Sequence, residues 1–266
     1  DRVKPMTVEK FVVELRSKGL ADSTVRQVYT VLRAILATAV RDGAMATNPA
    51  AAVARPRVSR HEAAYLTPEE GRTLLAAASG SRYEPLFELL AHTGLRRGEA
   101  LALRWDDVDL DKHVLSVSGT LARVDGVLVV TEPKTARSKR FVHVSPAVED
   151  LLRRVRRRQV EERLRAGSQW VERGFIFTTE FGEPCDPRNA LRALKAAAAK
   201  AKLPASVGLH TLRHSAASTM LTNGVPLKVA SEILGHSSIS ITADTYGHVA
   251  PKVAQAALDT LSSALS

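Results

Sequence analysis

The hydrophobic pattern at the start of the chain has the period of amphipathic helices. Apolar residues recur at the i, i+3, i+4, i+7 spacing from Val8 onwards, and a glycine follows the run. A second stripe of the same period extends from Val25 to Ala39 and includes Ile35. We therefore predict an all-helical N-terminal domain over residues 1–58, with a thin core because only two helices contribute to it.

The stretch that follows, "ARPRVSRHEAAY", is basic, contains a proline and shows no hydrophobic period. Such a composition is typical of a connection between domains, and we place a linker at residues 59–65. A new helix should begin directly after it, because Thr67 can cap the helix, Pro68 suits its first position and Glu70 completes a capping box. The helical period then continues to about Leu103.

The period of the apolar positions changes after this point. The runs "HVLSVSG", "VLVVTE" and "RFVHVS" are short, β-branched and partly alternating, which predicts a small antiparallel sheet. The helical period returns at Pro146. Further helices are expected at 187–201, 210–223, 226–234 and 238–246, with a tail helix after Pro251. The predicted fold is mainly α with a small antiparallel β-sheet, in which residues 66–266 form a mixed α/β domain.

The net positive charge of the chain indicates a negatively charged partner. The 266 residues include 38 Lys and Arg against 28 Asp and Glu, which gives a net charge of +10. Such an excess favours polyanions, nucleic acid before an anionic membrane surface, although a merely basic protein has the same balance. No window of about 20 apolar residues exists, so we expect no membrane span. The single cysteine, Cys185, excludes an internal disulfide and fits a reducing cytoplasm.

The run "HTLRH" places two polar side chains on one face of a predicted helix. His210 and Arg213 are three residues apart and so point in the same direction. His210 and His214 at i, i+4 suggest zinc as an alternative, but the metalloprotease form of that motif needs a glutamate after the first histidine, where Thr211 stands. A polar patch on a surface helix is the plain alternative.

The run "LGHSSISITADTYGHV" carries a histidine in a turn and a tyrosine ten residues later. Two short helices around this turn are similar to a helix-turn-helix, which would make the segment a DNA reader. That interpretation leaves His236 and Tyr246 without a role. Further upstream, "TGLRRGE" supplies adjacent arginines, and "PKTARSKR" places Lys134 in a turn between two predicted strands, where a lysine is usually exposed.

Together these residues fit one reaction at a phosphodiester. Guanidinium groups bind phosphate oxygens and stabilise the extra negative charge of a pentacoordinate state. A tyrosine can attack the phosphorus and hold it covalently, provided that a neutral histidine accepts its proton. A lysine can protonate the leaving 5′ oxygen. Because the arginines neutralise the charge, this reaction requires no metal ion and no other cofactor.

The runs "TGLRRGE", "PKTARSKR", "HTLRH", "LGHSS" and "DTYGH", in this order, resemble the tyrosine recombinases, the phage-integrase family of site-specific DNA recombinases. The resemblance covers most of the chain after the linker. It implies that Arg96 and Arg213 clamp the scissile phosphate while Tyr246 attacks it, which gives a 3′-phosphotyrosine and a free 5′-hydroxyl. Glu99 would hold Arg96 in place. Arg96 is preferred to Arg97 because it directly follows "TGL".

The resemblance also assigns the remaining polar residues. Lys134 is the expected general acid and Lys139 the competing candidate; Lys134 matches the family better because it precedes the threonine of "KT". His210 is the expected acceptor of the tyrosine proton, and His236 is expected to hydrogen-bond a non-bridging oxygen. The chain would thus be an integrase that breaks and rejoins DNA without ATP. A type IB topoisomerase, which has a similar site, and a non-catalytic DNA-binding regulator are the alternatives.

The two ends of the chain also resemble parts of phage-type integrases. Residues 1–58 look like the end of the SAM-like core-binding domain, but are fewer than usual, so the chain is either a short integrase or truncated. In the family the C-terminal tail helix docks on a neighbouring protomer, which implies a homo-tetramer on two DNA duplexes that carry attachment sites. A DNA-bending accessory protein would be a further partner. The expected location is the cytoplasm of a bacterial host.

Overall fold

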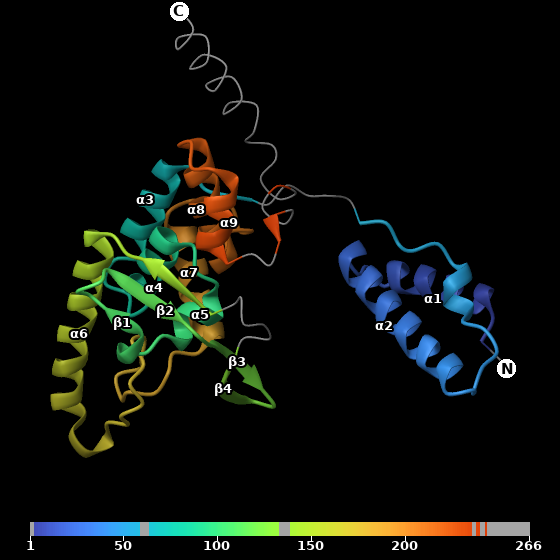
Figure 1. The fold of residues 1–266 in the computed structure, drawn as a ribbon, viewed down its shortest axis with the longest axis horizontal. Helices are drawn as coiled ribbons and strands as arrows, with labels where there is room; N and C mark the ends of the chain where they lie inside the picture. The colour runs from blue at the N-terminus through green and yellow to red at the C-terminus, as the bar shows by residue number, and fades with distance from the viewer. Residues whose placement is uncertain (1–2, 59–63, 133–138, 236–237, 240–242, 244–266) are drawn as a thin grey trace, which may run out of the picture. The chain divides into compact units, whose positions relative to one another are not determined.

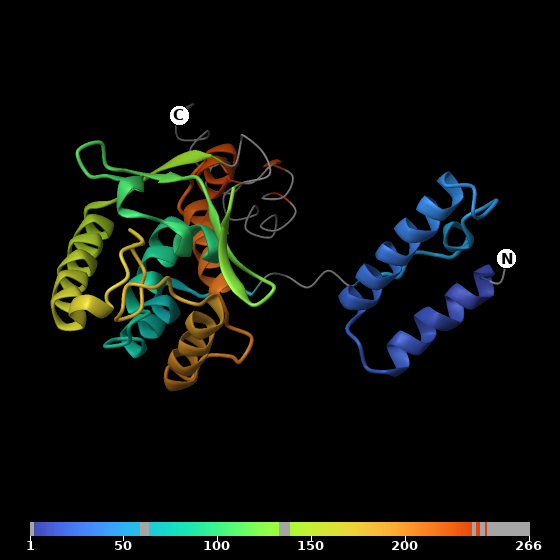
Figure 2. The same ribbon diagram turned by 90° about the horizontal axis from the view of Figure 1, so that it is seen from below.

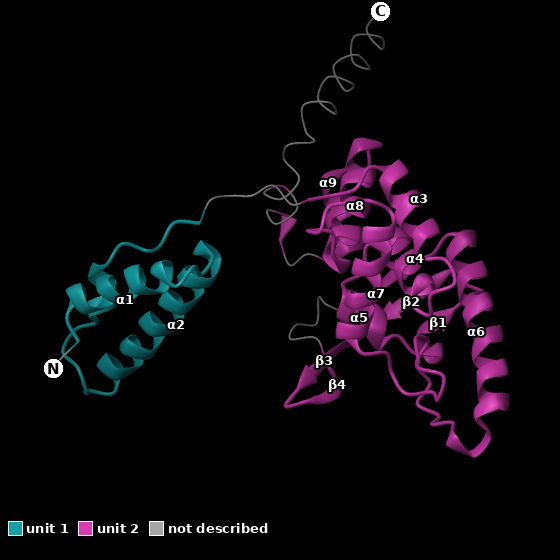
Figure 3. Ribbon diagram, turned by 180° about the vertical axis from the view of Figure 1, so that it is seen from behind, with its two compact units in different colours: residues 1–62 teal, residues 63–266 magenta. Residues whose placement is uncertain are grey.

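The structure is a computed structural model that describes residues 3–58, 64–132, 139–235, 238, 239 and 243. It contains two compact units, residues 1–62 and residues 63–266, which we describe separately as unit 1 and unit 2 (Figure 3). The predicted linker, 59–65, lies largely outside the described residues. Among the helices that the structure describes, none is long and apolar enough to cross a membrane.

Unit 1 consists of two helices and a short 3-10 helix. The helix α1 (Pro5–Ser17) packs on α2 (Asp22–Arg41), and η1 (Pro49–Ala52) contacts both. The buried hydroxyl of Tyr29 lies within hydrogen-bond distance of the carbonyl oxygens of Ala50 (2.7 Å) and Val53 (2.9 Å). A buried phenol requires such partners, so these contacts hold the end of the unit against α2.

The predicted helices of unit 1 are present, but the predicted core of α2 is partly wrong. Ile35 is 60% exposed, whereas Tyr29, which lies outside the predicted stripe, is buried. The hydroxyl of Tyr29 donates to carbonyls at and just after η1, which gives the phenol the polar partners that its burial requires. Aliphatic periodicity alone carries no information about such a contact.

Unit 2 begins with the helices α3 (Pro68–Ala77), α4 (Glu84–Thr93) and α5 (Arg97–Ala102). The predicted start of α3 is confirmed by its cap. The Thr67 amide donates to the Glu70 carboxylate (2.8 Å), and the Glu70 amide donates to the Thr67 hydroxyl (3.2 Å). This capping box satisfies two amides that would otherwise have no partner at the helix start.

Two antiparallel sheets follow the 3-10 helix η2 (Trp105–Asp107) in the described part of the chain. The first has the strand order β1-β2-β5, with β1 (Val108–Asp109), β2 (Val114–Val117) and β5 (Arg140–His143). The second is a hairpin of β3 (Thr120–Val124) and β4 (Val127–Thr131). Its turn residues Asp125 and Gly126 have positive φ angles of 47° and 84°, as a two-residue hairpin turn requires. Along the chain, this hairpin lies between β2 and β5, which pair with each other, so it is an insertion between two paired strands.

The predicted antiparallel sheet is present, as two sheets, and two of its strands, β1 and β3, were not predicted from the sequence. Strand β1 has only two residues, too few to show a period. Strand β3 has one buried residue, Leu121, so no apolar alternation marks it in the sequence. It is a strand because all five of its residues pair with β4.

Helices make up most of the remaining described part of unit 2. They are α6 (Pro146–Ala166), α7 (Pro187–Lys200), α8 (Leu209–Thr222) and α9 (Leu227–Leu234), with the 3-10 helix η4 (Gly167–Gln169) after α6. The predicted ranges for α7, α8 and α9 are correct to within one residue at each end. The predicted helix 238–246 and the tail helix lie almost wholly outside the described residues.

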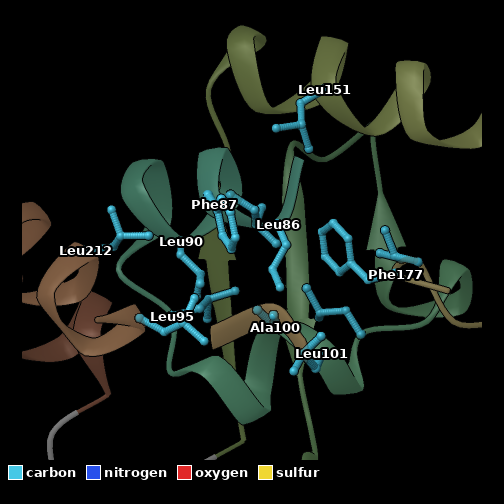
Figure 4. Packing of buried hydrophobic residues seen from close by; sticks show 14 of the residues in the cluster. Leu86, Phe87, Leu90, Leu95, Ala100, Leu101, Leu151, Phe177 and Leu212 are labelled. Carbon is cyan, nitrogen blue, oxygen red and sulfur yellow. The ribbon is translucent and has the colours of Figure 1, made fainter. Parts of the chain in front are cut away.

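The core of unit 2 forms around α4 (Figure 4). Leu86, Phe87 and Leu90 of this helix are fully buried, and each contributes on the order of 1.5–3 kcal/mol by leaving water. Leu151 of α6 and Leu212 of α8 pack against this centre. Helix α6 lies along one flank of unit 2, while α8 and α9 lie on the opposite flank (Figures 1 and 2). The central helix thus fixes where α8 runs.

Candidate active site

Three helix ends meet on the flank formed by α8 and α9. Helix α4 ends at Gly94 (φ 64°), α5 begins at Arg97, and α9 ends before Gly235 (φ 67°). Both glycines adopt the left-handed conformation that stops a helix. A Cβ atom on Gly94 would lie 2.7 Å from Cδ2 of Leu234, so glycine is also what allows the ends of α4 and α9 to approach.

Arg213 of α8 joins the ends of α4 and α9. Arg213 is buried, and its guanidinium donates from Nη1 to the carbonyl oxygen of Gly94 (2.7 Å) and from Nη2 to that of Leu234 (2.8 Å). The last carbonyls of a helix lack partners within the helix and carry the negative end of its dipole. Because both acceptors are neutral groups, these bonds fix the guanidinium plane without cancelling its charge.

Arg96 lies between α4 and α5 and meets the same helix end from the other side. It donates from Nη2 to the carbonyl oxygen of Gly235 (2.9 Å) and from Nη1 to Oε1 of Glu99 (2.7 Å). The Arg96 amide donates to Oε2 of Glu99 (2.9 Å). The contact between Glu99 and Arg96 that the resemblance implied is thus present, and the Arg96 side chain is 39% exposed. Of the two adjacent arginines, Arg96 is the one bound to this network.

A residue that the sequence analysis did not assign completes the network. Arg140, the first residue of β5, donates from Nη1 and Nη2 to the two oxygens of Glu99 (3.2 and 3.0 Å) and from Nε to the carbonyl oxygen of Ile233 (3.3 Å). In the sequence, Arg140 is marked only by its place at the end of "PKTARSKR", a run in which the lysines are the candidates for the general acid. We call Arg96, Arg140, Arg213 and Glu99 the arginine cluster.

His210 lies in the first turn of α8, three residues before Arg213, as the helical spacing predicts. Burial by neighbouring atoms lowers the pKa of its imidazole, and the positive charges of Arg97, Arg213 and Arg96 lower it further. A lowered pKa keeps the ring neutral at neutral pH, which is the form that can accept a proton.

The zinc alternative rested on His210 and His214. The pKa of His214 is lowered as well, by burial first and then by His210 and Arg213. No group of three or more histidine, cysteine, aspartate or glutamate side chains lies close enough to hold a metal ion among the residues that the structure describes.

Three of the predicted site residues, Lys134, His236 and Tyr246, lie outside the described residues and stay predictions. Lys139, the alternative to Lys134, is described and exposed directly before β5. The structure therefore brings Arg96, Glu99 and Arg213 together from segments that are far apart in the sequence. Arg96 and Arg213 are also close enough to His210 to act on its pKa.

The arginine cluster contains three guanidinium groups and one carboxylate. Within the described residues, Arg96 and Arg140 share the Glu99 carboxylate, and the acceptors that the arginines meet at the end of α9 are uncharged carbonyls. Arginine stays charged in proteins and matches the oxygens of a phosphate in its fork geometry. The chemical capacity of this arrangement is to bind an anion and to stabilise additional negative charge on it.

Comparison with known proteins yields a family and close structural neighbours. The sequence model of the phage integrase family matches residues 64–252. A "Tyrosine recombinase XerC-like" protein of Caldanaerobacter subterraneus subsp. tengcongensis is 34% identical over 277 aligned residues, which cover 97% of this chain and 71% of that protein. An integrase of Saccharopolyspora erythraea is 26% identical and covers 98% of this chain and 72% of its own length.

The fold is also that of a solved integrase. The structure of the Tn1549 transposon integrase in complex with a circular intermediate DNA aligns with a TM-score of 0.83 and 24% sequence identity. The alignment covers 98% of this chain and 86% of that one. The mainly helical fold with small antiparallel sheets is thus shared with that integrase.

Proposed function

The chain belongs to the phage integrase family and is a tyrosine site-specific recombinase, and on this premise we propose that it cleaves DNA through Tyr246. The nucleophile attacks a phosphodiester, which forms a 3′-phosphotyrosine and releases a 5′-hydroxyl. The observation that carries this proposal is the arginine cluster, in which Arg96 and Arg213 meet the same end of α9. Two guanidinium groups that bond to adjacent carbonyls of one helix end, one of them also braced by Glu99, are suited to a singly charged phosphate.

The first requirement of the reaction is to neutralise charge. A phosphodiester repels a nucleophile, and the pentacoordinate state holds more negative charge on its non-bridging oxygens than the starting diester. We assign this stabilisation to the guanidinium groups of Arg96 and Arg213. Removing one preorganised donor from such a site typically costs about 10²–10³-fold in rate. A hydrogen bond from His236 to a non-bridging oxygen adds to it.

Two proton transfers complete the step. The Tyr246 oxygen forms a bond to phosphorus as its proton passes to neutral His210, while the bond from phosphorus to O5′ breaks and Lys134 protonates that oxygen. Attack by a 5′-hydroxyl of another strand reverses these movements and rejoins DNA. The phosphotyrosine conserves the energy of the broken bond, so the reaction as proposed consumes no ATP and uses no metal ion.

The substrate we propose is double-stranded DNA that carries attachment sites. The net charge of +10 supports a polyanionic partner, and the similar transposon integrase was solved in complex with DNA. We assign residues 1–58 as a core-binding domain that contacts the duplex and residues 66–266 as the catalytic domain. A homo-tetramer on two duplexes, joined through the C-terminal segments, would bring the exchanging strands together.

A covalent-trapping assay tests this function. The substrate is a nicked duplex that carries the DNA flanking the gene for this protein, and the readout is a protein–DNA adduct that resists SDS on a denaturing gel. We expect an adduct with the wild-type chain and none with Tyr246→Phe, which lacks the attacking oxygen. Equal adducts from both proteins would remove Tyr246 from the mechanism. Tight, salt-sensitive binding without any adduct would favour a DNA-binding regulator instead.

A further inference from the structure

Three consecutive carbonyls at the end of α9 each accept a hydrogen bond from a different arginine. The carbonyl oxygen of Ile233 accepts from Arg140, that of Leu234 from Arg213, and that of Gly235 from Arg96. Two of these arginines are the proposed phosphate clamps. The third has no role in the proposed chemistry, yet it is bound to the same helix end.

Arg140 uses all three nitrogens of its guanidinium. Its Nε bonds the carbonyl of Ile233, and Nη1 and Nη2 bond the two oxygens of Glu99. Its side chain is only 9% exposed, so water does not replace these partners. A lysine presents a single nitrogen and cannot span a carboxylate and a carbonyl in this way.

Glu99 connects Arg140 to Arg96. Each carboxylate oxygen accepts one bond from Arg140 and one bond from Arg96, the latter from its side chain at Oε1 and from its amide at Oε2. Burial would raise the pKa of this carboxyl, but Arg140 and then Arg96 lower it below its ordinary value. Glu99 is therefore a charged bridge between the two arginines.

The backbone at Gly235 is in direct contact with Arg140. A Cβ atom built on Gly235 would lie 2.5 Å from Cζ, 2.6 Å from Nη1 and 2.7 Å from Nε of Arg140. The guanidinium thus packs flat against the glycine whose carbonyl holds Arg96. Arg140 touches both partners of Arg96, the carboxylate on one side and the end of α9 on the other.

We propose that Arg140 is a positioning residue for strand cleavage, which acts by holding Glu99 and the end of α9 where they orient the guanidinium of Arg96. The inference rests on the proposed function, since Arg96 is its route to the phosphate. It also gives β5 a part in the site, because the strand that follows the lysine-bearing segment delivers the residue that braces Arg96.

The test uses variants of Arg140 beside matched variants of an arginine on the other flank. Arg82 also pairs with a buried glutamate, Glu162 of α6 (3.0 Å), and donates to the carbonyl of Thr178 (3.1 Å). Helix α6 lies opposite α8 and α9 (Figure 1). Arg140→Gln and Arg140→Lys are therefore compared with Arg82→Gln and Arg82→Lys, which remove a partly exposed arginine from a buried glutamate away from the site.

The measurement is single-turnover cleavage of two nicked duplexes, one with a phosphodiester and one with a methylphosphonate at the scissile position. The methyl group replaces a charged non-bridging oxygen, so the second substrate needs less charge neutralisation. We expect Arg140→Gln to lower cleavage of the phosphodiester by about 10²-fold, as for a misplaced catalytic group. On the methylphosphonate the loss should shrink to about 10-fold or less, because the stabilised charge is smaller.

The ratio of the two rates distinguishes positioning from folding. A variant that is partly unfolded loses the same fraction of activity on both substrates, so its ratio equals that of the wild type. Arg82→Gln and Arg82→Lys should show this unchanged ratio, and Arg140→Lys should show the shifted one because it keeps the charge but loses the fork.

An unchanged ratio in both Arg140 variants, or wild-type rates in both, would overturn the inference. The proposed function stands or fails separately. It fails if the wild-type chain forms no adduct or if Tyr246→Phe still forms one, whereas the inference fails only when the wild type cleaves through Tyr246 and the Arg140 variants behave like those of Arg82.

Discussion

Two clusters of arginines surround a buried glutamate on opposite flanks of unit 2. One is the arginine cluster at the ends of α4 and α9, built on Glu99. The other, which we call the α6 cluster, is built on Glu162 and consists of Arg82, Arg158, Glu162 and Glu180. Both clusters combine ion pairs with hydrogen bonds from guanidinium groups to backbone carbonyls.

The two clusters differ in charge balance. In the α6 cluster two arginines face two carboxylates, and Glu162 alone contacts both arginines, at 3.0 Å from Arg82 and 3.8 Å from Arg158. In the arginine cluster, as far as the described residues show, three arginines are grouped around one carboxylate, and helix-end carbonyls accept many of their hydrogen bonds. Carbonyl dipoles can hold a guanidinium in place without neutralising it.

The comparison teaches that the same residue types become structural or anion-binding according to their counter-charges. A group whose charges are balanced has little net charge left to offer an anion, and it stabilises the fold at most modestly, because desolvation offsets much of the attraction. An unbalanced group retains a positive potential, which an anion can complete. Three substitutions test this distinction, in order of their expected effect on strand cleavage.

Arg213→Lys should have the largest effect. One ammonium group cannot reach the carbonyls of Gly94 and Leu234 and also match a phosphate, so cleavage should fall by about 10³-fold in a single-turnover assay. Binding of the duplex, measured by fluorescence anisotropy, should change far less, because many other contacts to the backbone remain. Loss of thermal stability with normal cleavage, the behaviour expected of the α6 cluster, would erase the distinction.

Gly235→Ala should have an intermediate effect. Alanine is disfavoured at a φ of 67°, by about 1–2 kcal/mol, and its Cβ would meet the guanidinium of Arg140. We expect cleavage to fall by about 10-fold or more, as Arg96 and Arg140 are displaced together. Gly224→Ala is the matched control, because Gly224 has a φ of 80° and no atom within 4 Å of an added Cβ. Equal cleavage rates in the two variants would mean that backbone strain alone is responsible.

Arg97→Gln should have the smallest effect, a shift of the pH profile. Arg97 is among the positive charges that lower the pKa of His210, so its removal should raise that pKa. His210 must be neutral to accept a proton, and activity is lost as pH falls through its pKa. The acid limb of the profile should therefore move to higher pH, while the plateau rate stays within about twofold.

The control for this shift is Arg165→Gln, which removes an exposed positive charge from α6 on the other flank. Its acid limb should coincide with that of the wild type. An acid limb that moves to lower pH in Arg97→Gln, or not at all, would show that His210 is not the group whose protonation limits cleavage.

Much of the local structure could be predicted from the sequence because it depends on neighbours along the chain. The capping box at Thr67 and Glu70 and the helices α7, α8 and α9 follow from caps and apolar period. The shared direction of His210 and Arg213 follows from helical spacing alone. The five ordered runs indicated the family, which the match over residues 64–252 establishes.

Predictions failed where a partner distant in sequence decided the outcome. Tyr29 is buried with its hydroxyl on carbonyls at and just after η1, while Ile35 of the predicted stripe is exposed. Strand β3 carries one buried residue and exists through its pairing with β4. Neither feature has a local signal, since hydrophobic periodicity reports only which face of an element is apolar.

The sequence by itself determined which residue types were available for phosphate chemistry, their order and their helical spacing. Only the tertiary structure decided how the arginines are held. Arg96 reaches the carbonyl of Gly235 across 139 positions, and Arg140 reaches that of Ile233 across 93. The physical reason is that a helix end offers unpaired carbonyls to any donor that packing brings near it, and packing is a property of the whole fold. Arg140 consequently has no mark in the sequence that separates it from the basic residues beside it.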